Sequence, residues 1–263
     1  MEKLFWTIEG THAAIVATAI HAGHIVSAQL LEKIALSEAD RLREEDPFTD
    51  IFTRPAAGRI VATHSRFEVD LNRPREGAVY QKPEDAWGLT VWKAPLSAEE
   101  LSHARSVYDA FYAQMAHYFD AVHARFGDFV VLDIHSYNHH RKGPDAPFDD
   151  PQANPDINIG TDTNPALTRW RPLIDTAIES MRGFDYFGRH LDVRENVKFG
   201  GGHFSEWIHR RYAPHACVLS IEFKKFFMDE WSGTPDERQI ARLEEMVAAL
   251  LPVIEASLEE MRS

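Results

Sequence analysis

The segment from Asp128 to Arg141, which reads DFVVLDIHSYNHHR, constrains the fold more than any other part of the chain. After Gly127 it begins with a short, partly β-branched apolar run that ends in a polar cluster. Such a run is typical of a strand buried in the centre of a sheet. His135 lies where this strand leaves the core. Because ligands bind outside the carboxyl ends of strands in open α/β sheets, His135 is placed for chemistry. A histidine that merely hydrogen-bonds a carbonyl is the alternative.

A second segment also predicts a strand that ends in histidine. Residues 13–20, AAIVATAI, form a short apolar run, and the tetrad HAGH follows at once. Either His21 or His24 is therefore a second histidine at a strand end. Two histidines delivered by two strands to one edge of a sheet would lie close together.

Two further segments supply carboxylates. The pair Asp46-Pro47 predicts the start of a helix, with aspartate as N-cap and proline at the first position. Asp50 lies four residues after Asp46 and hence on the same helix face. In residues 217–223, which predict another buried strand, Glu222 interrupts the apolar run. A buried, unpaired carboxylate is costly, so Glu222 predicts a nearby cation or a raised pKa suited to proton transfer, with a structural ion pair as the alternative.

Helices and strands alternate along the chain. Ser97 and Glu100 form a capping box at the start of a helical pattern that lasts until Gly127 and feeds the central strand. Residues 59–63 predict a strand before that helix. This alternation predicts an α/β fold with three layers, α/β/α, and a mostly parallel or mixed central sheet. No linker divides the 263 residues, so we expect a single domain spanning residues 1–263.

Four segments predict less regular structure. Residues 67–72 alternate apolar and polar side chains and predict extended structure. Residues 75–96 predict a long loop packed by its aromatic side chains, and residues 142–164 predict a loop rich in Pro, Asp, Asn and Gly. The three glycines at 200–202 indicate either a close backbone approach or a plain turn.

Composition excludes several classes of function. A net charge of -13 argues against a nucleic-acid partner, and no apolar run is long enough for a membrane span. The single cysteine, Cys217, cannot form an internal disulfide, and the apolar stretch 13–20 lacks the basic flank of a signal peptide. We therefore expect a cytoplasmic location. Within this acidic chain, Arg66, Arg73 and Arg75 form a local basic cluster.

The two histidines and one helix carboxylate predict a metal centre. A catalytic zinc site needs three protein ligands of nitrogen or oxygen type and one open position for water. His135, one histidine of the HAGH tetrad and a carboxylate from Asp46 or Asp50 meet that need. Glu222 is then free for proton transfer. We expect one zinc ion per chain.

Several spaced motifs resemble the N-formylglutamate amidohydrolase family. In chain order they are IHAGH, the D-x-x-x-D of DPFTD, SRFEVDLNRP, LDIHSYNHH, DINIGT, NVKFGGG and the late IEF. The resemblance covers roughly residues 14–231. It implies a zinc-dependent hydrolase with a phosphorylase/hydrolase-like fold, related in site design to zinc carboxypeptidases, aspartoacylases and cell-wall amidases.

The resemblance also implies a role for individual residues. His24 matches the glutamate of the carboxypeptidase His-x-x-Glu pair and is therefore the main rival of Asp50. An arginine of the DLNRP segment would hold a substrate carboxylate through a bidentate fork. The implied metal ligands are His21, Asp50 and His135, the implied general base is Glu222, and the implied substrate-binding residues are Arg66, Asn72 and Arg73.

The activity implied is hydrolysis of the amide bond of a small, anionic N-formyl or N-acyl amino acid, by metal-activated water with a glutamate base. A zinc carboxypeptidase or peptidoglycan amidase on the same fold is a rival and would need an extended groove. A catalytically silent ligand-binding relative is the rival of a different class.

Overall fold

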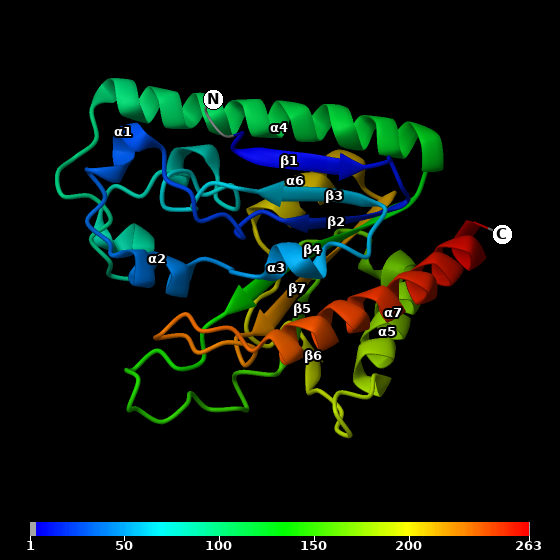
Figure 1. Ribbon diagram of the computed structural model, residues 1–263. Helices are drawn as coiled ribbons and strands as arrows, with labels where there is room; N and C mark the ends of the chain where they lie inside the picture. Colours follow the sequence, from blue (N-terminus) through cyan, green and yellow to red (C-terminus); the bar gives the residue numbers. More distant parts are fainter. Residues whose placement is uncertain (1–3, 263) are drawn as a thin grey trace.

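The computed structural model describes residues 4–262, and its strands form one seven-stranded mixed sheet (Figure 1). The strand order is β1-β3-β2-β4-β7-β5-β6. Strands β3, β2, β4 and β7 run parallel, whereas β1 is antiparallel to β3 and β5 is antiparallel to β7. The strands are β1 Trp6–Gly10, β2 Ile15–Ala19, β3 Gly58–Ala62, β4 Phe129–Tyr137, β5 Ile157–Gly160, β6 Val193–Glu195 and β7 Ala216–Lys224.

Seven α-helices accompany the sheet within the described residues. The longest, α4, begins with the predicted capping box: the Glu100 N–H donates to Ser97 Oγ at 3.2 Å, and the Ser97 N–H donates to Glu100 Oε2 at 2.7 Å. It ends at Gly127, which has a φ of 69°. The helices are α1 Ala28–Leu31, α2 Glu38–Glu44, α3 Thr49–Phe52, α4 Ala98–Phe126, α5 Leu167–Gly183, α6 His203–Tyr212 and α7 Glu237–Arg262.

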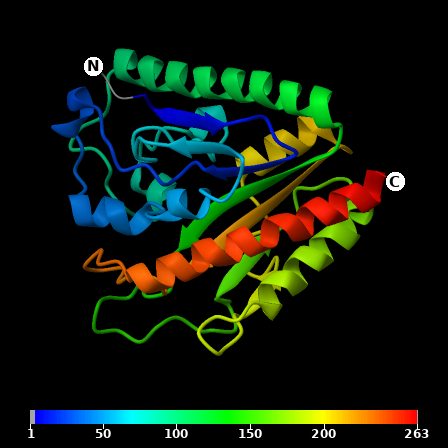
Figure 2. The same cartoon turned by 45° about the vertical axis from the view of Figure 1, so that its right-hand side comes forward.

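Helices cover both faces of the sheet, with α4 and α6 on one face and α3, α5 and α7 on the other (Figures 1 and 2). Alternate residues of β4 enter the two cores. Phe129 and Val131 pack with α4 and α6, whereas Val130, Leu132 and Ile134 pack with α5 and α7. All nine residues of β4 are buried. The prediction of a three-layer α/β/α fold with a mixed sheet is confirmed.

Three neighbouring parallel strands, β2, β4 and β7, bring the predicted site residues to one edge of the sheet. His21 follows the end of β2, and His135 lies near the end of β4. Glu222 on β7 is the register partner of His135. The sheet therefore assembles at one edge three side chains that the sequence places far apart.

Two of the irregular segments differ from prediction. Residues 67–72 form turns instead of extended structure, because the polar side chains face inward and bind backbone groups: the Asn72 N–H donates to Asp70 Oδ1 at 2.8 Å. Strand β5 lies inside the segment 142–164, which was predicted to be all loop. The loop 75–96 does pack through its aromatic side chains, since Tyr80 and Trp92 belong to one buried cluster.

Within residues 4–262, no helix is both long and apolar enough to cross a membrane.

Candidate metal centre and substrate pocket

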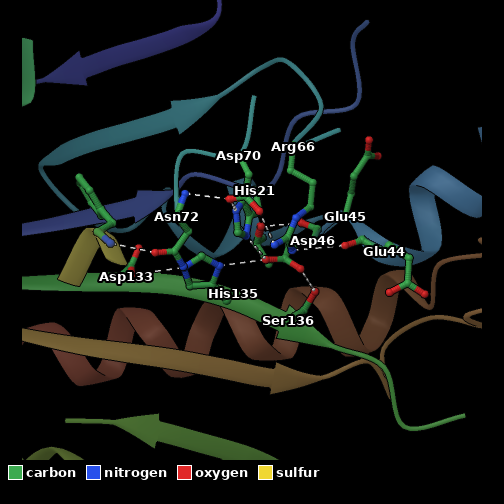
Figure 3. A network of polar contacts seen from close by, with 12 residues as sticks. His21, Glu44, Glu45, Asp46, Arg66, Asp70, Asn72, Asp133, His135 and Ser136 are labelled. Carbon is green, nitrogen blue, oxygen red and sulfur yellow. Dashed lines mark hydrogen bonds and ion pairs between the residues drawn. The ribbon is translucent and has the colours of Figure 1, made fainter. Parts of the chain in front are cut away.

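His21, Asp46 and His135 form a buried group in which one potential ligand atom from each residue lies within 4.8 Å of the other two (Figure 3). Asp46 Oδ2 lies 3.0 Å from His135 Nδ1 and 3.5 Å from His21 Nδ1. The two histidines thus present the same ring nitrogen to one carboxylate.

Asp46 reaches the histidines because its backbone is hydrogen-bonded to His21, just after β2. The Asp46 N–H donates to the His21 carbonyl at 3.0 Å, and Ser136 Oγ donates to Asp46 Oδ1 at 3.3 Å. The prediction that Asp46 is a helix N-cap is wrong. Helix α3 begins at Thr49 with Phe48 as its N-cap, so the Asp46 side chain is directed into the site instead.

Asp50 does not join this group, although the sequence comparison implied that it is the helix carboxylate. It lies in the first turn of α3, where its carbonyl accepts hydrogen bonds from Thr53 Oγ1 and Arg59 Nη2. Because the Asp46 backbone is hydrogen-bonded to His21, Asp46 and not Asp50 faces the histidines.

His24 also lies outside the group. Its Nδ1 is paired with Glu45, and its Nε2 lies 3.4 Å from Glu38 Oε1. Of the alternatives left open by the HAGH tetrad, the structure therefore brings His21 to the site.

In each of the two histidines, His21 and His135, the other ring nitrogen, Nε2, lies next to a second carboxylate. His21 Nε2 donates to Asp70 Oδ1 at 2.7 Å. His135 Nε2 lies 3.2 Å from Asp133 Oδ2. A metal-binding histidine commonly directs its other ring nitrogen to a carboxylate, which fixes the tautomer and orients the ring. Both imidazoles therefore have the arrangement expected of metal ligands that bind through Nδ1.

The buried charges of the site shift the pKa values of its residues. Burial alone would raise the pKa of Asp46, but hydrogen bonds and charge from His135 and His21 hold it well below its usual range. Burial opposes protonation of His135, yet the carboxylates of Asp133 and Asp46 raise its pKa well above its usual value. Carboxylates of Asp46, Asp70 and Asp133 thus surround the two imidazoles, and Asp70 is also paired with Arg66. Two imidazole nitrogens and one carboxylate oxygen suit a divalent metal such as zinc.

Glu222 lies beside this group as the register partner of His135, and its side chain lines the same cavity. Burial raises the pKa of Glu222 to about 8, against an opposing influence of His135. A carboxyl group that titrates near neutral pH is suited to accept and return a proton. The predicted raised pKa is therefore found in the structure.

A cavity of about 260 Å³ contains both the metal-site residues and the predicted substrate-binding residues. Its wall combines side chains from the ends of β2, β4 and β7 with the turns of residues 66–73 and 199–202. The residues identified from the sequence that line it are His21, Arg66, Asn72, Arg73, His135 and Glu222, together with Asp46.

Arg66 and Arg73 differ in how firmly they are held. Arg66 Nη2 donates to Asp70 Oδ2 at 2.8 Å, and its guanidinium lies over the ring of Trp87 at 4.9 Å. Arg73 is looser, since its side chain is 40% exposed and its Nη2 donates only to the Asp85 carbonyl, at 3.3 Å. Arg73 thus keeps more donors open to a ligand.

The glycine run at 200–202 marks a close approach to Asn72. A Cβ atom on Gly202 would lie 2.3 Å from the Asn72 amide atoms. The Phe204 N–H donates to Asn72 Oδ1 at 2.9 Å, which fixes the amide against the start of α6. Of the two explanations offered by the sequence, the close approach is confirmed.

Several residues of the site and of its cavity were not identified from the sequence. Asp133 stands two residues before His135, and strand periodicity places both side chains on one face of β4, so the spacing in LDIH could have revealed it. Asp70 stands two residues before Asn72 in the same turn. Arg141 and Lys225 also line the cavity, but no motif indicates their position.

The model of the N-formylglutamate amidohydrolase family matches residues 13–228. The chain belongs to this family. The predicted family is thereby confirmed, and with it the amidohydrolase type of hydrolase. No curated protein matches the chain in sequence.

Among solved structures, the chain is similar to an N-formylglutamate amidohydrolase from Ralstonia eutropha JMP134, with a TM-score of 0.73 and 18% identity over 97% of this chain and 98% of that one. It is also similar to a gene product of Agrobacterium tumefaciens, with a TM-score of 0.65 and 19% identity over 95% of this chain and 96% of that one. These structures share the fold of the chain.

Proposed function

We propose that the protein hydrolyses the amide bond of a small N-formyl or N-acyl amino acid, in a zinc-dependent reaction with Glu222 as general base. One observation carries the proposal. A single cavity of about 260 Å³ holds the group of His21, Asp46 and His135 together with Glu222 and Arg73.

One zinc ion per chain would be held by His21, Asp46 and His135, the residues whose ligand atoms face one another. When bound, zinc lowers the pKa of a water ligand to about 7 and polarises a carbonyl group. Asp70 and Asp133 keep the histidines oriented, since each lies at the Nε2 atom that faces away from Asp46.

Glu222 would take the proton of the attacking water and return it to the leaving nitrogen. Two features support this role. The side chain lines the cavity next to His135, and its pKa is raised towards the pH at which an acid and base catalyst works best. The same carboxyl group then serves both proton transfers.

Arg73 and Asn72 would hold the carboxylate of the amino acid. Arg73 has guanidinium donors open to the cavity, and a planar fork of N–H groups matches a carboxylate. Arg66 adds positive charge from a position fixed by Asp70. An anionic substrate is therefore favoured.

The dimensions of the cavity support a small substrate. Pockets for small molecules typically occupy about 300 to 1,000 Å³, and this cavity lies just below that range. A carboxypeptidase or peptidoglycan amidase would need an extended groove for the polymer on both sides of the cleaved bond. We therefore propose an N-acyl amino acid in preference to a peptide or glycan strand.

A comparison of two aspartate variants tests the proposal. Asp46→Asn should lose most of its zinc by elemental analysis and most of its hydrolysis of N-formyl-L-glutamate, because one ligand oxygen is removed. Asp50→Asn is the matched control and should keep both. Full zinc occupancy in Asp46→Asn would overturn the metal assignment, and a zinc-loaded parent protein that hydrolyses no N-acyl amino acid would overturn the activity.

A further inference from the structure

Asp46 lies in the short connection between α2 and α3, and the direction of its side chain depends on how that connection is held. Helix α2 ends at Glu44, and Glu45 follows with an extended backbone, at φ −78° and ψ 178°. The last carbonyls of a helix have no partner inside the helix. The carbonyls of residues 43–45 therefore need partners from other segments.

Lys225 holds the backbone of this connection. Its Nζ donates to the carbonyls of Arg43 and Glu45, both at 2.6 Å. A hydrogen bond from a charged donor is about twice as strong as one between neutral groups. Lys225 is 1% exposed, so water has little access to these contacts. The ammonium group thus bridges two carbonyls, and the second of them belongs to the residue directly before Asp46.

Lys225 is itself fixed to the sheet. It directly follows β7, and its N–H donates to the Tyr137 carbonyl at 3.0 Å, at the end of β4. His135 lies near that end of β4, and Glu222 lies near the end of β7. The Lys225 side chain therefore joins the strand ends that carry His135 and Glu222 to the connection that carries Asp46.

The peptide unit between Glu45 and Asp46 is held at both of its polar atoms. Its carbonyl accepts from Lys225 Nζ, and its N–H donates to the His21 carbonyl at 3.0 Å. Because a peptide unit is planar, two hydrogen bonds on opposite sides fix the orientation of the plane. The start of the Asp46 side chain is fixed with it.

His24 holds the side chain of Glu45. Its Nδ1 pairs with Glu45 Oε2, and Ser65 Oγ donates to Glu45 Oε1. The hydrogen bond to Glu45 raises the pKa of His24, because a carboxylate stabilises the protonated imidazole. Glu45 is fully buried, so the pair lies away from water. The second histidine of the HAGH tetrad thus contacts the neighbour of Asp46.

We propose that Lys225 and His24 are positioning residues that hold Glu45 and thereby direct the Asp46 carboxylate at His21 and His135. This inference rests on the metal group of the proposed function. It assigns a role to a buried lysine that lines the cavity and to a histidine that is not a predicted ligand in the structure.

Zinc affinity of the folded protein, measured by chelator competition, is the first test. Lys225→Met keeps most of the side-chain volume and removes both hydrogen bonds to the connection. It should weaken zinc binding by at least about tenfold, as expected when a group that orients a ligand is lost. Lys225→Arg keeps a charged donor and should bind zinc more tightly than Lys225→Met.

Two controls separate positioning from a general loss of stability. Lys224 is the neighbouring lysine, but its Nζ pairs with Asp156 Oδ1 at 2.6 Å and it does not line the cavity, so Lys224→Met should keep the parent affinity. Ile254 is fully buried in the core of α5 and α7, so Ile254→Val should destabilise the fold and still keep the parent affinity.

A second variant covers the case in which Lys225→Met fails to fold. The His24 side chain is 32% exposed, so its replacement disturbs the core less. His24→Leu loses the contact with Glu45 and should weaken zinc binding by at least about threefold.

Hydrogen exchange of the metal-free protein separates this inference from the proposed function. The Asp46 N–H should exchange at least about tenfold faster in Lys225→Met and in His24→Leu than in the parent. The Val130 N–H, which donates to the Ala14 carbonyl at 2.8 Å within the sheet, should keep the parent rate.

A parent protein that binds no zinc but shows this exchange pattern would overturn the proposed function and leave the positioning role standing. The positioning role is overturned if the Asp46 N–H exchanges at the parent rate in every folded variant. It is also overturned if the parent binds zinc and every folded variant of Lys225 and His24 binds it equally well.

Discussion

Asp133 Oδ2 lies 3.2 Å from His135 Nε2, two residues along the same strand. Within the described part of the chain neither atom has a hydrogen-bond partner, so the contact between them is an ion pair, and the other Asp133 oxygen accepts from Thr18 Oγ1 at 2.8 Å. Thr18 thus fixes the carboxylate, and the carboxylate in turn fixes the imidazole. His135 therefore presents Nδ1 to Asp46 for a structural reason that lies inside the sheet.

Asp133→Asn should weaken zinc binding by about 10-fold to 100-fold, because an amide cannot hold the histidine tautomer as a carboxylate does. Chelator competition measures the affinity directly. Ser220→Ala is the control, since Ser220 is the register partner of Asp133 and its buried Oγ has no partner in the described chain. Equal zinc affinity in the parent and Asp133→Asn would show that Asp133 has no positioning role.

Arg73→Lys should reduce kcat/KM by a factor equivalent to about 1 to 3 kcal/mol of transition-state binding, because lysine keeps the charge but loses the two parallel N–H donors of the guanidinium. The zinc content should not change. A substrate whose α-carboxylate is amidated should already be poor with the parent enzyme and should lose little more with the variant. This non-additivity is expected when two changes remove one contact. Losses that simply add would place the α-carboxylate elsewhere.

Gly202→Ala should impair substrate binding without removing zinc. Its new Cβ would lie 2.3 Å from the Asn72 amide, which must then move, and a displacement of about 1 Å at a binding group can cost roughly 100-fold in rate. Gly183→Ala is the control, because nothing lies within 4 Å of a Cβ at that position. Activity near that of the parent in Gly202→Ala would mean that Asn72 does not contribute to binding.

Protonation of the buried His209 should destabilise the folded protein in mild acid. It is 1% exposed, its Nε2 accepts from the Val218 N–H at 2.9 Å, and burial lowers its pKa to about 4. The folded-state pKa of His209 lies below its unfolded value of about 6.5. Its contribution to the unfolding free energy is therefore fully present at neutral pH and is lost as the pH drops from about 6.5 towards 4.

Between pH 7 and pH 5, the parent should therefore lose about 2 kcal/mol more unfolding free energy than His209→Gln, measured by urea denaturation. Glutamine can still accept the Val218 N–H but does not titrate. The same pH dependence in both proteins would show that His209 is not the responsible group.

The central sheet could be predicted because its strands are apolar runs of strand length. The strands β2, β4 and β7 are buried on both faces, so their sequences are nearly continuous apolar runs that can be recognised. Strand β5 has only four residues and lies in a segment rich in turn-forming residues, so its pairing with β7 depends on contacts that the sequence does not display.

The site, too, has residues that a local sequence pattern reveals and residues whose position depends on contacts between distant segments. His21 and His135 were found because each is a polar residue that follows an apolar run, and Glu222 was found because it interrupts one. The choice between Asp46 and Asp50 depended on the hydrogen bond from the Asp46 N–H to the His21 carbonyl, which joins two segments. Helix spacing carries no information about such a bond, and the sequence alone could therefore not separate the two aspartates.

Because His21, Asp46 and His135 come from separate segments, binding of a metal ion by them would be linked to folding of the whole sheet. Asp46 and His135 are 89 residues apart, and each takes its position only once β2 and β4 have paired. A partly folded chain would therefore not bind an ion as the native chain would. An ion at 100 times its dissociation constant would add about 2.7 kcal/mol to the global unfolding free energy, so a lesion anywhere in the sheet becomes more harmful under metal limitation.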